Sequence, residues 1–137
     1  MEAHYKKIVR GFTLVELMVV ILMVAILAAV ALAIYRTKLD AAKWSEGKAM
    51  MGTVATAIRV YHSEQGPTGP VPTALYAGST GLGFNPGDLT GTYFVDGDFS
   101  FNVTSMAPLR FIVTATPSFV SLKPPSYQLD QSGSWTP

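Results

Sequence analysis

The sequence contains no cysteine among its 137 residues. Disulfides, c-type haem attachment and thiolate metal sites are therefore excluded, and the fold must be held by packing and hydrogen bonds. Histidine is nearly as scarce, since His4 and His62 are the only two. Neither stands in a motif of nucleophilic catalysis or metal binding. We therefore expect neither an enzyme nor a cofactor.

Charged residues make up only 14% of the chain, and the formal net charge is +1. Beyond Gln65, two basic side chains, Arg110 and Lys123, oppose the aspartates Asp88, Asp96, Asp98 and Asp130. Phosphate-binding proteins carry an excess of basic residues instead. No nucleic-acid partner is expected.

An unbroken apolar run extends from Leu17 to Tyr35, which is 19 residues (35 − 17 + 1). As a helix this run would be about 28 Å long, close to the thickness of a bilayer's hydrocarbon core. Lys6, Lys7 and Arg10 precede it, and positive charge keeps that end of a membrane span cytoplasmic. The run predicts a membrane-inserted chain whose C-terminal part lies outside.

Glu16 is the only acidic or basic side chain between Gly11 and Arg36. A charge within a membrane span is unfavourable by roughly 2.5–3.5 kcal/mol at the bilayer centre. Glu16 could reach the headgroups or act as a first-turn acid favoured by the helix dipole. It could also pair with a positive charge from another chain. Charge alone leaves both interpretations open.

Residues 10–17, Arg-Gly-Phe-Thr-Leu-Val-Glu-Leu, resemble the N-terminal methylation motif of bacterial type IV pilins and type II secretion pseudopilins. The resemblance implies that a prepilin peptidase cuts between Gly11 and Phe12 and methylates the new amine of Phe12. It also implies that Glu16 meets the Phe12 amine of a neighbouring subunit during assembly. A conventional signal peptide or a plain membrane anchor would not account for Gly11-Phe12 together with Glu16.

The expected fold class is α+β, with one long N-terminal helix packed on a small antiparallel sheet of about 3–4 strands. No proline interrupts residues 12–64, and helical spacing places Gly47, Met50, Val54, Ala57, Ile58 and Tyr61 on one apolar stripe. The expected segments are a cleaved basic leader (1–11), a hydrophobic transmembrane or filament-core helix (12–37), an amphipathic helix half (38–64), a glycine- and proline-rich loop (65–91), and the sheet with the C-terminal segment (92–137).

Alternating apolar and polar residues predict the strands of this sheet. Thr92–Val95 and Phe99–Thr104 flank Asp96-Gly97-Asp98, which predicts a hairpin. A third strand is expected at Leu109–Thr116 and a short fourth at Ser126–Asp130.

Asp88, Asp96 and Asp98 are the only acidic cluster that could supply oxygen ligands to calcium. Asp-Gly is also ordinary turn chemistry, and this interpretation is preferred. We expect no metal site and keep these three as the residues that calcium would use.

The sequence and the family resemblance together predict a structural subunit of a type IV pilus-like extracellular filament. The precursor would reside in the inner membrane, and the filament at the cell surface would serve adhesion or motility. Implied partners are further copies of the chain, prepilin peptidase and the inner-membrane assembly machinery. Two alternatives remain: a secretion pseudopilin or minor pilin, and a membrane-tethered binding module.

Overall fold

A computed structural model describes residues 11–118 and 120–137. The predicted leader, apart from Gly11, lies outside these residues. The described chain divides into an N-terminal unit, which ends at Arg36, and a C-terminal unit, Thr37–Pro137. We describe each unit by itself.

The predicted long helix is present as α1, Leu14–Gln65, with 52 residues. Its continuity follows from the absence of proline and the abundance of good helix formers. α1 ends where Gly66 adopts a positive φ of 74°, a conformation that costs glycine little. Pro67 follows and cannot continue a helix.

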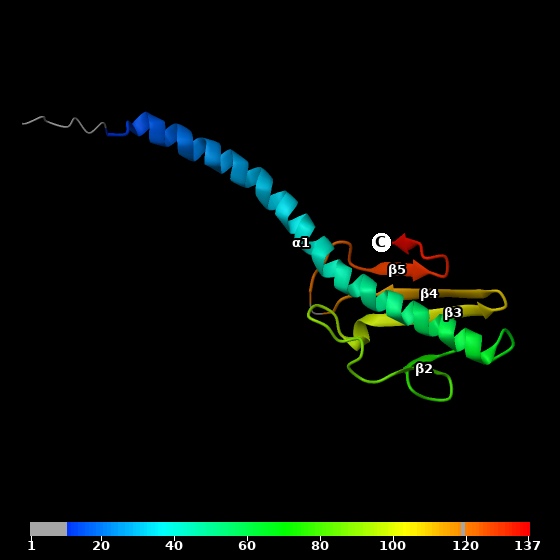
Figure 1. Ribbon diagram of the computed structural model, residues 1–137. Helices are drawn as coiled ribbons and strands as arrows, with labels where there is room; N and C mark the ends of the chain where they lie inside the picture. The colour runs from blue at the N-terminus through cyan, green and yellow to red at the C-terminus, as the bar shows by residue number, and fades with distance from the viewer. Residues whose placement is uncertain (1–10, 119) are drawn as a thin grey trace, which may run out of the picture. The chain divides into compact units, whose positions relative to one another are not determined.

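The remaining elements confirm the α+β fold class (Figure 1). An antiparallel four-stranded sheet has the order β3-β4-β5-β6, and a separate two-stranded sheet pairs β1 with β2. The bounds are β1 (Ala74–Tyr76), β2 (Gly81–Phe84), the short 3₁₀ helix η1 (Asp96–Asp98), β3 (Phe99–Met106), β4 (Leu109–Ala115), β5 (Tyr127–Asp130) and β6 (Trp135–Thr136).

The hairpin predicted around Asp96-Gly97-Asp98 is wrong. Thr92–Val95 is not a strand, and Asp96–Asp98 forms η1. The physical reason is side-chain chemistry: Asp98 Oδ2 accepts the Val95 N–H at 3.0 Å, and Glu46 Oε1 accepts the Tyr93 N–H at 2.8 Å. These carboxylates take up backbone donors that a strand partner would otherwise satisfy. The real hairpin joins β3 to β4 through Ala107 and Pro108.

The core of the C-terminal unit lies between α1 and one face of the four-stranded sheet. Trp44 is nearly fully buried, its ring packs edge-on against Tyr127 at 4.8 Å, and its indole N–H donates to the Pro124 carbonyl at 3.0 Å. The predicted apolar stripe of α1 is confirmed in part. The face that is actually buried is turned toward Trp44, Met51 and Ala55, and Met50 and Ala57 of the predicted stripe are only half-buried. The core members from α1 are Trp44, Met51, Val54, Ala55, Ile58 and Tyr61.

Candidate functional site

The peptide bond between Gly11 and Phe12 lies in irregular backbone ahead of α1. The Phe12 side chain is 80% exposed. A Cβ added to Gly11 would have no contact within 4 Å among the neighbours considered. Exposed, irregular backbone near a chain end is where proteolysis concentrates. The bond that the sequence predicts to be cut is therefore accessible.

Thr13 and Glu16 form a reciprocal cap at the start of α1. The Glu16 N–H donates to Thr13 Oγ1 at 3.2 Å, and the Thr13 N–H donates to Glu16 Oε2 at 2.9 Å. The Thr13 hydroxyl donates to the same carboxylate oxygen at 2.7 Å. This is a capping box, which satisfies backbone donors that lack partners within the helix. The cap fixes the helix start at Leu14, one residue after Thr13.

Our sequence analysis missed Thr13, although the spacing Thr13-x-x-Glu16 is the signal of a capping box. The cap gives Glu16 a local role at the helix start. Among the described residues, both of the hydrogen bonds that Glu16 accepts use Oε2. A carboxylate offers about four acceptor positions on its two oxygens. Glu16 can therefore cap its own helix and still accept a hydrogen bond from a second chain through Oε1.

The N-terminal unit exposes an apolar helical surface from its first turn to its end. In the described residues one helix, α1, is long and apolar enough to cross a membrane, and its most apolar window has no buried residue. In the described residues of this unit, side chains on every face of the helix are exposed, so none of these faces packs on a core within the unit. The larger exposed side chains include Leu17, Ile21, Leu22, Leu27, Val30, Leu32 and Tyr35.

The three calcium candidates each accept hydrogen bonds within the fold. Asp88 Oδ2 accepts the Asn85 N–H at 2.8 Å, and Asp98 Oδ1 accepts the Ser118 N–H at 2.9 Å. Asp96 accepts four hydrogen bonds, from Gly87, Leu89, Thr90 and Tyr76. The part of the chain that the structure describes contains no group of three or more histidines, cysteines or carboxylates arranged to hold a metal ion.

Asp96 fastens the loop between β2 and η1. Its Oδ1 accepts the Leu89 N–H and the Thr90 hydroxyl, each at 3.0 Å. Its Oδ2 accepts the Gly87 N–H and the Tyr76 hydroxyl. These donors, the Gly87 N–H first, hold the pKa of Asp96 below its usual range. The carboxylate thus has a structural role in this loop.

Comparison with known proteins finds one family model, which matches the N-terminal segment, and one curated relative. Residues 6–32 match the prokaryotic N-terminal methylation motif. The fimbrial protein EcpC of Eikenella corrodens is 39% identical over 61 residues, a segment that covers 44% of this chain and 40% of that relative. No solved structure matches the chain. The two matches confirm the family resemblance on which the sequence analysis relied.

Proposed function

We propose that this chain, which carries the N-terminal motif of the type IV pilin family, is the structural subunit of a type IV pilus-like extracellular filament. The proposal rests on two features that occur together. Residues 6–32 match the methylation motif, and the apolar helix has no buried residue in its most apolar window. An isolated apolar surface of this kind is unstable in water, so it needs lipid or protein around it.

In the precursor, lipid would surround the helix from Leu17 to Tyr35. In the filament, the same side chains would be covered by the helices of neighbouring copies. The exchange costs little, because lipid tails and leucine side chains are similarly apolar, and helix association in membranes depends on packing and polar contacts. The C-terminal unit has its own core, so it can remain folded in water throughout. Inner-membrane assembly machinery would supply the work of extraction.

Processing would prepare the subunit for assembly. Prepilin peptidase would cut the accessible bond between Gly11 and Phe12, and the new amine of Phe12 would be methylated. That amine lies one residue before the helix cap, where the helix dipole disfavours positive charge. The Glu16 carboxylate of an adjacent copy offsets this charge, and its free Oε1 provides the acceptor. The pair would fix the axial register between copies.

The experiment combines intact-mass measurement of purified surface material with imaging of cells. We expect filaments built from a chain that begins at Phe12 and carries one added methyl group. Gly11→Val, which crowds the peptidase site, should leave full-length protein in the membrane and no filaments. The matched control is Gly78→Val in the loop between β1 and β2, where the backbone φ is not positive and an added Cβ would meet no atom within 4 Å. This variant should be processed normally.

The same experiment separates the alternatives. A processed chain that never forms surface filaments at native expression, but is required for protein secretion, is a secretion pseudopilin. A processed chain present at trace level in filaments of another subunit is a minor pilin. A membrane-tethered binding module would form no filaments and would keep an unmethylated N-terminus, and that result would overturn the proposal.

A further inference from the structure

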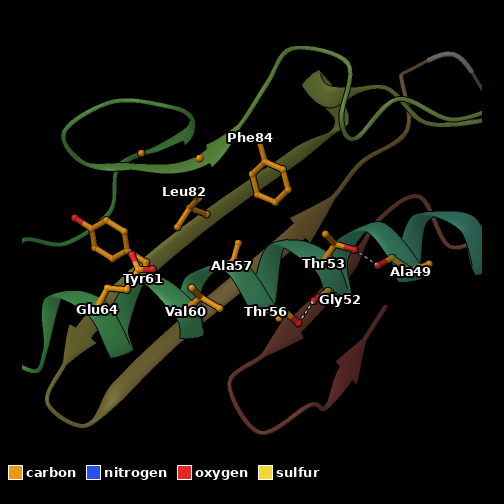
Figure 2. Close-up of a pocket in the computed structure, with 12 residues that line it drawn as sticks. Ala49, Gly52, Thr53, Thr56, Ala57, Val60, Tyr61, Glu64, Leu82 and Phe84 are labelled. Atoms are coloured by element: carbon orange, nitrogen blue, oxygen red, sulfur yellow. Dashed lines mark hydrogen bonds between the residues drawn. The ribbon is translucent and has the colours of Figure 1, made fainter.

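A groove in the C-terminal unit lies between α1 and β2 (Figure 2). Its volume is about 850 Å³. On one side Gly52, Ala57 and Val60 of α1 line it, and on the other side Leu82 and Phe84 of β2 face the helix. The groove runs along α1 beside the helix–sheet core, and Tyr61 belongs to both.

The two threonine hydroxyl groups in this groove are satisfied inside α1. Thr53 Oγ1 donates to the Ala49 carbonyl at 3.2 Å, and Thr56 Oγ1 donates to the Gly52 carbonyl at 2.9 Å (Figure 2). Such back-bonded hydroxyls do not depend on water for a hydrogen-bond partner. An apolar surface can therefore cover these two threonines without leaving an unsatisfied donor.

The two glycines within α1 have different surroundings. A Cβ on Gly47 would lie 2.5 Å from Phe94 Cζ, so the fold itself requires a glycine there. A Cβ on Gly52 would meet no atom within 4 Å. The isolated chain therefore gives no packing reason for Gly52, whose missing side chain keeps the groove deep. Small residues on a helix allow another helix to approach closely.

Tyr61 joins the groove to the core of the C-terminal unit. It lines the groove, and its side chain is only 7% exposed. Among the described residues its buried hydroxyl has no hydrogen-bond partner. Buried hydroxyl groups are nearly always paired in folded proteins. Because this hydroxyl is shielded from solvent, it does not itself reach an occupant of the groove.

Charge and length indicate the occupant. Among the residues that the structure describes, Glu64 is the only charged one that lines the groove. In the same sequence, the apolar run that ends at Tyr35 is followed directly by Arg36 and then Lys38, both exposed. The groove residues extend from 49 to 64, which is about 22 Å of helix, similar to the roughly 28 Å of the apolar run. An apolar helix with a basic end fits an apolar groove with an acidic end.

We propose that this groove binds the apolar helical segment, residues 17–38, of a second copy of the chain. The inference rests on the proposed filament function and adds a specific contact to it. In this contact Gly52 admits the partner helix, and Glu64 meets the basic residues that follow the partner's apolar run.

The test uses a photocrosslinking amino acid, p-benzoylphenylalanine, in place of Thr53 in the full-length chain. The variant is co-expressed with the wild-type chain so that filaments form, and crosslinked peptides are identified by mass spectrometry. We expect crosslinks to residues 17–38 of another copy. The same probe at Asn102, an exposed position on β3 outside the groove, should not give them. Filaments in which the Thr53 probe crosslinks elsewhere, to another protein or not at all overturn the inference while leaving the filament function standing.

A second measurement uses Gly52 itself. Gly52→Leu should fill the groove. Because the position is open, the full-length chain should still insert, be processed and melt at or above the wild-type temperature. We expect at least a tenfold loss of filaments. Gly52→Ala, the matched control, should assemble normally. Wild-type yield from Gly52→Leu would overturn the groove contact. If the wild-type chain is neither processed nor assembled, the proposed filament function is contradicted, and the groove contact that rests on it is contradicted too.

Discussion

At the scale of single residues, Glu16 has a local role in the structure and a proposed role in assembly. It caps its own helix through Oε2, and we propose that its charge pairs with the Phe12 amine of a neighbour. Glu16→Gln retains an amide oxygen that can accept the Thr13 N–H, but it removes the charge. Leaving a buried charge without its partner typically costs roughly 3–5 kcal/mol. We expect normal insertion and cleavage, and few or no filaments by electron microscopy.

Thr13→Ala is the matched control for this prediction. It removes the hydroxyl of the capping box and keeps the Glu16 charge. Loss of an N-cap side chain costs about 1 kcal/mol of helix stability, so filaments should persist at reduced yield. If Glu16→Gln is processed and assembles as well as the wild type, apolar packing alone drives assembly.

Gly47 and Gly52 provide a second prediction at this scale, because alanine has opposite effects at the two positions. Each glycine lowers helix stability by roughly 1 kcal/mol relative to alanine. At Gly47 the new methyl group would clash with Phe94, whose ring is buried and packs against Trp44 and Phe99. Overpacking of a core costs about 1–3 kcal/mol. Thermal melts should show Gly47→Ala less stable than the wild type and Gly52→Ala more stable. Equal stabilisation by both would contradict the packing of Phe94 on Gly47.

At the scale of elements, Asp96 fastens the loop between β2 and η1, and this contact should depend on pH. The Gly87 N–H, followed by smaller contributions from neighbouring donors, lowers the pKa of Asp96 from its ordinary value of 3.8. A carboxyl group whose pKa is lowered by folding stabilises the fold above its unfolded pKa. That contribution is lost as the pH falls through the lower folded pKa. Asp96→Asn should therefore reduce the melting temperature at pH 7, and its difference from the wild type should shrink as the pH falls below about 4.

Limited proteolysis locates this effect. Asp96→Asn should increase cleavage between Asn85 and Gly91, because the N–H groups of Gly87 and Leu89 lose a charged acceptor. Asp130→Asn is the matched control, since its carboxylate binds Ser132 and Ser134 in a different turn. Increased cleavage in the loop of both variants would indicate general destabilisation and would contradict the specific role of Asp96.

At the scale of the whole molecule, the described core residues all belong to the C-terminal unit. We therefore expect a fragment of residues 37–137 to be soluble, folded and monomeric without detergent. The measurements are circular dichroism melts and size-exclusion chromatography. Ile58→Ala in the fragment should reduce the free energy of unfolding by about 2–5 kcal/mol, because Ile58 is fully buried. A fragment that aggregates or melts without cooperativity would show that the apolar segment is needed for folding.

The amino-acid sequence was sufficient to predict the local and periodic features of this protein. Gly11, Phe12, Glu16 and the apolar run lie close together in sequence, so the methylation motif that they belong to could be recognised without knowing any distant contact. The long helix and β4 were also predicted within a few residues, because helix propensity and strand alternation are short-range signals. The family comparison supports the same N-terminal segment.

The tertiary structure determined which residues compete for the same backbone donors and which surfaces remain uncovered. The Asp96-Gly97-Asp98 turn was predicted as a hairpin, but Glu46, 47 positions before Tyr93 in the chain, binds the backbone that would have formed the first strand. Likewise, the sequence gives no reason to distinguish the two glycines of α1. The structure distinguishes them: Gly47 leaves room for the ring of Phe94, whereas a side chain at Gly52 would meet no atom within 4 Å. Local propensity cannot predict contacts between distant segments of the chain. These contacts depend on side-chain hydrogen bonds and packing between residues that come together only in the folded structure.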